Sequence, residues 1–226
     1  MKKFLIAILL MMNFVGIYAA SPKTIAVLGD SYSTYQGLMT PKSNWVWYKE
    51  PKRDVTDVCS ADQTWWKILT ADSTQYRLGV NNSFSGSTIC STGYHGDDYS
   101  DRAFYTRIAN LGNPDIIIVF GGTNDAWANS PMGDYKWRNW TKADLYNFRP
   151  AMACMLDGLE TLYPNAQVLF ILNSELKPEV NESVHEICKH YGVDCIDLVD
   201  IEKLGNHPSI KGMQAIADQV RPHLQK

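Results

Sequence analysis

The stretch Asp115-Ile-Ile-Ile-Val-Phe120 is a continuous apolar run, rich in β-branched residues and without polar alternation. A run of this kind is typical of a parallel strand whose two faces are both covered by helices. Four other segments have the same character, at residues 24–28, 76–80, 166–172 and 193–198. The sequence therefore predicts a sheet of five parallel strands.

Amphipathic helical patterns lie between and around these strands. Apolar side chains recur at helical spacing in residues 64–71, 101–111, 151–163, 180–191 and 209–224. Alternating strands and helices, joined by right-handed crossovers, place helices on both faces of a parallel sheet. We therefore expect an α/β fold, a three-layer α/β/α sandwich of the flavodoxin-like type.

The composition is that of a globular protein. Of the 226 residues, 45% are hydrophobic and 20% are charged, which suits one well-packed domain rather than two. The net charge of −3 provides no basic surface for nucleic acid or for an anionic membrane. We expect neither as a partner, and the sequence gives no indication of the oligomeric state.

The N-terminus has the pattern of an export signal. Two lysines precede an apolar run that ends in small residues, all within residues 1–20. A membrane anchor is the alternative, but the run is short for a span and is interrupted by Asn13. We predict a secretion signal peptide at residues 1–20 and a single domain at 21–226. The mature protein is then periplasmic or extracellular and is not inserted in a membrane.

Export permits disulfides, and the chain has five cysteines, so at least one is left unpaired. Cys188 with Cys195, and Cys59 with Cys90, are the candidate pairs; five reduced cysteines are the alternative. Cys154 has the surroundings of a small buried hydrophobe. No Cys-x-x-Cys or His-x-x-x-His spacing occurs, so no metal site is expected.

Four short polar motifs follow predicted strands or precede the last predicted helix. They are Gly29-Asp30-Ser31, Asn82-Ser-Phe-Ser-Gly86, Gly121-Gly-Thr-Asn-Asp125 and Asn206-His-Pro-Ser209. Each alone has a structural explanation, as a turn or a helix cap. Ligands of parallel sheets bind beyond the carboxyl ends of the strands, where the first three motifs begin.

Together these motifs contain the groups needed for acyl transfer. The Ser31 hydroxyl is the candidate nucleophile, and His207 is the candidate base that takes its proton. The backbone N–H groups of Ser31 and Gly86 and the side-chain amide of Asn124 are candidate donors to an oxyanion. We predict that all four residues meet at one edge of the sheet.

On these motifs the chain resembles the SGNH hydrolase superfamily, also called GDSL-type esterases. Ser31 matches the nucleophile, Gly86 and Asn124 match the oxyanion residues, and His207, within His-Pro-Ser-x-x-Gly, matches the base. The resemblance extends over residues 24–224. It implies a three-layer α/β/α fold and esterase or lipase-type chemistry that uses no cofactor and no metal.

The chain departs from this family pattern beside the histidine. The family usually carries an aspartate three residues before the base, and Leu204 stands there. The simplest consequence is a Ser–His dyad whose imidazole N–H donates to a backbone carbonyl or to water. Glu202, Asp200 and the more distant Glu175 are alternative acceptors, of which Glu202 is favoured as third catalytic residue.

Two long segments, residues 35–63 and 126–141, are rich in aromatic residues and are too long to be simple connections. Aromatic faces stack on sugar rings, although they also form ordinary loop cores. We take four tryptophans as candidate substrate-binding residues, Trp45, Trp47, Trp127 and Trp137. The segments contain few aliphatic side chains of the kind a lipid-binding mouth would present.

The resulting expectation is an exported serine ester hydrolase that removes small acyl groups, such as acetyl, from carbohydrate. Its partner is then a small-molecule or glycan ester. Two alternatives stay open at this point. One is a lysophospholipase or thioesterase of the same superfamily, and the other is a catalytically impaired glycan-binding protein on this scaffold.

Overall fold

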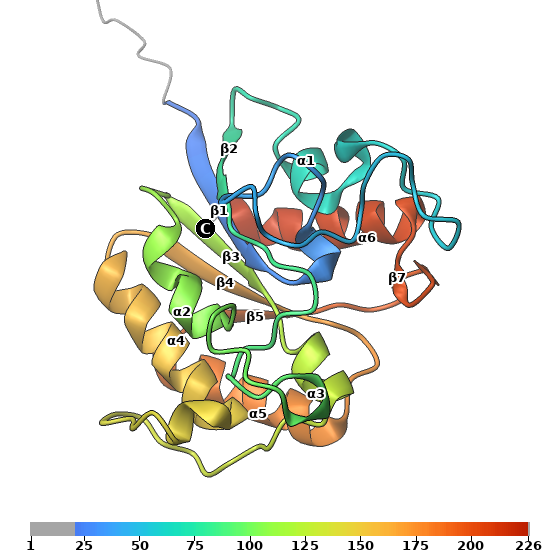
Figure 1. The fold of residues 1–226 in the computed structure, drawn as a ribbon. Coiled ribbons are helices and arrows are strands. Elements are labelled where there is room, and N and C mark those ends of the chain that lie inside the picture. Colours follow the sequence, from blue (N-terminus) through green and yellow to red (C-terminus); the bar gives the residue numbers. More distant parts are fainter. Residues whose placement is uncertain (1–20, 226) are drawn as a thin grey trace, which may run out of the picture.

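The computed structural model describes residues 21–225. Its centre is a five-stranded parallel sheet with the strand order β2-β1-β3-β4-β5 (Figure 1). The strands are β1 (Lys23–Gly29), β2 (Tyr76–Asn81), β3 (Ile116–Phe120), β4 (Gln167–Leu172) and β5 (Asp194–Asp197). All five predicted strands are confirmed, within a few residues at their ends.

Helices cover both faces of the sheet, as Figure 1 shows. One face is covered by α1 (Trp65–Leu69) and α6 (Ile210–Val220), and the other by α2 (Phe104–Arg107), α4 (Phe148–Leu162) and α5 (Pro178–Tyr191). A sixth helix, α3 (Thr123–Ala128), follows β3. The predicted three-layer α/β/α sandwich is therefore confirmed.

The unbroken apolar sequence of β3 is explained by its two buried faces. Ile116, Ile118 and Phe120 belong to the hydrophobic core on the α1–α6 side, whereas Ile117 and Val119 belong to the core on the α2–α4–α5 side. Successive side chains of a strand point to opposite faces, so a strand buried on both sides has no polar position.

The predicted helices differ from the observed ones at their ends. Residues 101–111 form only one α-turn and a 3₁₀ turn, and α6 ends at Val220, where a 3₁₀ turn replaces it. Helix α5 ends at Gly192 with φ of 63°, the left-handed conformation that glycine adopts at little cost. The 3₁₀ segments are Ser31–Ser33, Ala61–Gln63, Tyr94–Gly96, Ile108–Asn110, Asp144–Tyr146 and Arg221–Gln225.

A small hairpin precedes α6. Its strands are β6 (Lys203–Leu204) and β7 (His207–Pro208), which pair antiparallel. The two turn residues, Gly205 and Asn206, have φ of 55° and 62°. Two left-handed residues in succession are typical of a type I′ turn, for which glycine and asparagine are favoured. This hairpin lies at the right of the view in Figure 1, where β7 is labelled.

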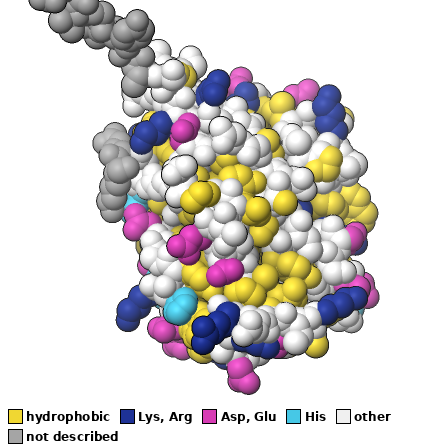
Figure 2. Space-filling model, turned by 90° about the vertical axis from the view of Figure 1, so that its left-hand side faces the viewer, with side chains coloured by type: hydrophobic (Ala, Val, Ile, Leu, Met, Phe, Trp, Pro, Cys, Tyr) yellow, Lys and Arg dark blue, Asp and Glu magenta, His cyan; other side chains and the backbone are white. Residues whose placement is uncertain are grey.

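Two surface properties of residues 21–225 bear on the expected partners. Within residues 21–225, no helix combines the length and apolar character needed to cross a bilayer. On the face shown in Figure 2, acidic and basic side chains are scattered among hydrophobic and neutral polar ones. The predicted signal peptide lies outside the described residues.

The five cysteines are free thiols, so neither candidate disulfide is formed. Cys59 is exposed and Cys90 is buried. Cys188 and Cys195 do lie beside each other, on α5 and β5. Cys154 is half-buried within α4. The cysteines therefore match the alternative in which all five are reduced. Of the two candidate pairs, Cys188 and Cys195 lie beside each other.

Candidate active site

Ser31 lies at the carboxyl end of β1, at the first position of a 3₁₀ turn. Asp30 caps this turn, because its Oδ1 accepts the Tyr32 N–H at 3.0 Å. Gly29 is required here by space: a Cβ on it would lie 2.6 Å from the Ser33 side chain and 2.7 Å from Ser83 Oγ. The turn therefore presents the Ser31 hydroxyl at the sheet edge where ligands of parallel sheets bind.

His207 meets Ser31 directly, as the sequence predicts: its Nε2 lies 2.9 Å from Ser31 Oγ. Two buried tyrosines hold the hairpin that carries the imidazole. Tyr32 donates to the Asn206 carbonyl at 2.6 Å, and Tyr48 donates to the Pro208 carbonyl at 2.8 Å. Tyr48 comes from the insertion at residues 35–63, so that insertion helps to position the candidate base.

The second imidazole nitrogen shows which group takes the place of the aspartate that is usual in the family at the position of Leu204. Nδ1 lies 3.0 Å from the Gly205 carbonyl oxygen. A carbonyl can only accept, so Nδ1 carries the proton and Nε2 has the free lone pair for the Ser31 hydroxyl. The structure thus has a Ser–His dyad oriented by a backbone carbonyl, which is the simplest of the expected arrangements.

The prediction that Glu202 is the third catalytic residue is wrong in this structure. Its carboxylate accepts the Ser209 hydroxyl at 2.6 Å and lies 3.7 Å from Lys211 Nζ. Glu175, the distant alternative, pairs with Lys203 at 3.1 Å. The hairpin turn is the physical reason, since it folds the Gly205 carbonyl back onto the imidazole. A Gly-Asn pair between two short extended segments is a hairpin signal in the sequence.

Aromatic rings enclose the imidazole of His207. The Trp47 indole stacks on it, with centroids 3.6 Å apart and planes 5° apart. Tyr32 and Trp127 approach edge-on, at 5.1 and 6.2 Å. Burial lowers the pKa of His207 to about 4, and the Arg53 guanidinium adds to this, while the hydrogen bond to Gly205 acts in the opposite direction. The imidazole is therefore neutral, as a base must be, at neutral and mildly acidic pH.

Hydrogen bonds hold the candidate oxyanion residue Asn124 in place. The buried Asn124 donates from Nδ2 to the Ser87 carbonyl at 3.0 Å, and its Oδ1 accepts the Tyr94 hydroxyl at 2.7 Å. These bonds fix the rotation of the amide and leave its second N–H free. Gly86 has φ of 82°, a conformation that glycine adopts readily.

Tyr94 was not among the predicted site residues. It comes from the segment between β2 and β3, thirty residues before Asn124, and no local motif connects the two. Burial raises the pKa of its hydroxyl to about 12, so the hydroxyl stays protonated and able to donate. Its sole sequence signal is a tyrosine within a polar loop.

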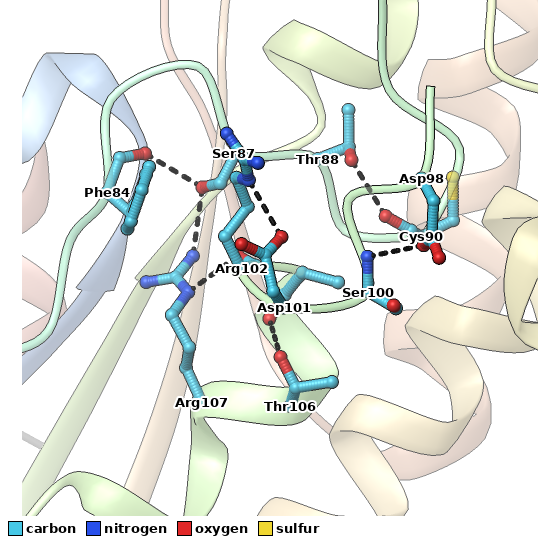
Figure 3. A network of polar contacts seen from close by, with 11 residues as sticks. Phe84, Ser87, Thr88, Cys90, Asp98, Ser100, Asp101, Arg102, Thr106 and Arg107 are labelled. Atoms are coloured by element: carbon cyan, nitrogen blue, oxygen red, sulfur yellow. Dashed lines mark hydrogen bonds and ion pairs between the residues drawn. The ribbon is translucent and has the colours of Figure 1, made fainter. Parts of the chain in front are cut away.

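A buried arginine supports the same side of the site. Arg107 is fully enclosed, and its guanidinium donates to the Gly29 carbonyl at 3.3 Å, to Ser87 Oγ at 3.0 Å and to the Asn82 carbonyl. Figure 3 shows Ser87 bridging this guanidinium and the Phe84 carbonyl. The arginine thus ties the end of β1 to the loop that carries Gly86. Burial lowers its pKa to about 9.

Two buried carboxyls accompany this arginine. Asp125 accepts the backbone N–H groups of Ile89 and Cys90 at 2.8 and 3.2 Å, and burial raises its pKa to about 6. Burial raises the pKa of Asp30 to about 7, although the Tyr32 N–H favours its charged form. Both carboxyls bind backbone near the site and act as supports of the loops rather than as reacting groups.

The four predicted substrate-binding tryptophans separate into distinct environments. Trp47 and Trp127 surround His207, and Trp45, 66% exposed, packs on Phe84 with centroids 6.0 Å apart. Trp137 is a correction: it stacks on His190 of α5 at 4.0 Å and packs in the core on the α4–α5 side. This part of the insertion packs against α5, whereas Trp127 of the same insertion lies beside His207.

A polar pocket of about 370 Å³ lies beside the dyad. It is lined by Trp127, Asn173, Glu175, Lys203 and Asn206. Trp127 is 42% exposed and contributes the one large aromatic surface of this lining. The other four side chains are amides or charges, which favour a hydroxylated or charged ligand over an alkyl chain.

The three-layer α/β/α sandwich thus carries a hydrogen-bonded serine–histidine pair at one edge of its sheet. Residues 23–224 match the family model described as GDSL-like lipase/acylhydrolase. The chain therefore belongs to the GDSL-like lipase/acylhydrolase family. No curated protein matches it.

Solved structures agree with this assignment. A protein from Bacteroides ovatus, named provisionally as a GDSL-like lipase, is 56% identical, with a TM-score of 0.89, and covers 91% of this chain and 99% of its own. A second, from Bacteroides uniformis, is 50% identical with a TM-score of 0.87, over 90% and 95% of the two chains. An acetyl xylan esterase from the rumen bacterium Butyrivibrio proteoclasticus shares the fold at 17% identity and a TM-score of 0.55, over 91% and 64%.

Proposed function

We propose that this protein is a serine ester hydrolase in which Ser31 is the nucleophile and His207 the general base. The distance of 2.9 Å between Nε2 and Oγ carries the proposal, because it is the hydrogen bond that such a pair requires. The Nδ1–Gly205 bond fixes the tautomer that can accept the serine proton.

The reaction proceeds in two halves. Ser31 Oγ attacks the acyl carbon while Nε2 takes its proton, and the carbonyl oxygen becomes an oxyanion stabilised by the Gly86 and Ser31 N–H groups and the Asn124 amide. The imidazolium then protonates the departing alkoxide as the C–O bond breaks, leaving the acyl group on Oγ. Water, deprotonated by His207, attacks this acyl-enzyme and releases the carboxylic acid and the free serine.

We propose a carbohydrate ester with a small acyl group, such as acetyl, as the substrate. Three features support it. Ser31 and Asn124 are only 4% and 2% exposed, which favours a small acyl group over a long chain. The adjoining pocket is polar. Trp45 and Trp127 offer exposed aromatic faces on which a sugar ring can stack. A fold shared with an acetyl xylan esterase is compatible with this chemistry.

The test compares p-nitrophenyl acetate with p-nitrophenyl octanoate and then measures acetate release from acetylated oligosaccharides. Ser31→Ala is expected to abolish turnover, and Ser73→Ala, at an exposed serine away from the site, is the matched control. Preference for the longer chain would favour a lysophospholipase or thioesterase. Absence of both turnover and fluorophosphonate labelling of Ser31 would favour a glycan-binding protein.

We also propose that the protein is exported, which rests on the sequence pattern of residues 1–20. Expression of the full chain in a bacterial host, followed by mass spectrometry of the secreted or periplasmic fraction, tests this. The expected mature chain begins near Ser21. Recovery of the full-length chain in the membrane fraction would indicate an anchor instead.

A further inference from the structure

A second cluster of reactive side chains lies at the far edge of the sheet from β2, away from Ser31. His185 and Cys188 belong to α5, and Cys195 and Asp197 belong to β5, the last strand of the sheet. The ligand atoms of His185, Cys195 and Asp197 all lie within 4.8 Å of one another. The Cys188 thiol, on the facing side of α5, lies beside that of Cys195.

The local structure explains why these side chains converge. Residues three apart on a helix share a face, which places His185 and Cys188 together. Residues two apart on a strand also share a face, which places Cys195 and Asp197 together. Ile196, between them, packs in the core on the opposite side of the sheet. Two elements thus each contribute a pair of ligand atoms from facing sides.

The surroundings favour a cation. His185 and Asp197 line a cavity of about 670 Å³ at the ends of β4 and β5, and three further carboxylates line it, Glu175, Asp200 and Glu202. His185 Nε2 already lies 3.1 Å from Asp197 Oδ1, and their side chains are 48% and 58% exposed. An ion can therefore reach the cluster from solvent, whereas the buried Cys188 closes its inner side.

We propose that His185, Cys188, Cys195 and Asp197 form a zinc site. Two sulfurs, one imidazole nitrogen and one carboxylate oxygen are the donor types that Zn²⁺ takes in tetrahedral sites. Bonds of about 2.0–2.3 Å put neighbouring ligand atoms roughly 3–4 Å apart. The atoms of His185, Cys195 and Asp197 are already close to this spacing, and the Cys188 thiol has to turn toward them to complete the set. Binding releases the two thiol protons to solvent.

The role of this site is structural. It links α5 to the short edge strand β5, which has a neighbour, β4, on one side only. It uses none of the residues that surround Ser31, so ester hydrolysis does not depend on it directly. No Cys-x-x-Cys or His-x-x-x-His spacing marks this site in the sequence, because the four ligands are divided between a helix and a strand.

The test uses the full purified protein, reduced and then freed of reductant. Zinc is titrated in competition with a chromophoric chelator, and cobalt is added separately to look for a thiolate-to-cobalt charge-transfer band. We expect one zinc per chain, the cobalt band, and a rise in melting temperature with added zinc. Cys188→Ser and His185→Gln should each weaken zinc binding by about tenfold or more. Cys59→Ser, at an exposed cysteine outside the cluster, should leave it unchanged.

His185→Gln keeps the proposal testable if the buried Cys188→Ser variant does not fold, because His185 is half-exposed. Zinc affinity unchanged in His185→Gln, or no zinc bound by the reduced protein, would overturn the proposal. So would a Cys188–Cys195 disulfide found by peptide mapping of the protein isolated without reductant. Esterase assays are read separately, so that loss of zinc binding and loss of hydrolysis remain distinguishable.

Discussion

Two sides of the candidate site are held in different ways: the Asn124 amide by hydrogen bonds at both ends, and His207 by the flat face of Trp47 and a two-residue turn. The first side is polar and is braced by the buried Arg107. The second is aromatic and has no carboxylate bonded to the imidazole. In the proposed mechanism, therefore, the oxyanion donor is held by fixed hydrogen bonds, whereas the base is held in its plane and tautomer by stacking and one carbonyl.

Removal of the base gives the largest expected effect. In His207→Ala nothing accepts the Ser31 proton, and kcat on p-nitrophenyl acetate should fall by about 10⁴-fold or more. Thermal unfolding of the same variant checks that the hairpin remains folded. Retention of more than a small fraction of the activity would show that His207 is not the base.

Weakening the polar side comes next. Asn124→Ala removes one oxyanion donor, and kcat should fall by about 10²–10³-fold.

Tyr94→Phe keeps that donor but frees the amide to rotate, so a smaller loss, roughly tenfold, is expected in kcat with little change in KM. Tyr105→Phe is the matched control, because its hydroxyl bonds Ser91 rather than the site. Equal effects of the two tyrosine variants would remove the proposed role of Tyr94.

The aromatic side is best examined by pH. Only the neutral imidazole accepts a proton, and burial lowers the pKa of His207 to about 4. The limb set by His207 should therefore lie at about pH 4, below which activity should fall tenfold per pH unit. The kcat/KM profile of the free enzyme measures this pKa. Glu202→Gln should leave the profile unchanged, since that carboxylate binds Ser209; a shift of the acid limb in this variant would restore Glu202 to the catalytic group.

The same two sides explain what could be predicted from the sequence. An apolar run without polar alternation, such as residues 115–120, predicts a strand whose two faces are both buried. The sheet and the helices that cover it could therefore be predicted from local sequence. Ser31, Gly86 and Asn124 were predicted as site residues because parallel strands bring their carboxyl ends to one edge. Those inferences needed no knowledge of how distant side chains contact one another.

The remaining residues depend on contacts that no local pattern records. Tyr94 and Arg107 act through partners many residues away, and the substitute for the usual aspartate is a backbone carbonyl, which every residue possesses. The Gly205-Asn206 turn was visible in the sequence as a hairpin signal, but its effect on the imidazole was not. Trp137 and Trp45 both lie in long aromatic-rich segments of the sequence. The folded structure distinguishes them, because Trp137 packs on α5.

That contrast between the two tryptophans gives the smallest predicted effect. Trp45 is exposed near the oxyanion loop, where its carbonyl accepts the Ser85 N–H at 2.9 Å, whereas Trp137 packs on α5. Trp45→Ala should raise KM for an acetylated oligosaccharide by about two- to tenfold, the size of one aromatic stacking contact, with kcat unchanged. On p-nitrophenyl acetate, which carries no sugar, the same variant should behave as wild type.

Trp137→Ala is the matched control for this measurement. It should lower the melting temperature, because a ring packed against His190 and Tyr191 is lost, and leave both KM values unchanged. If Trp45→Ala instead impairs both substrates equally, the indole supports the oxyanion loop rather than the sugar. The aromatic faces around Ser31 would then have a structural function, and the carbohydrate part of the proposal would lose its main support while the dyad chemistry stands.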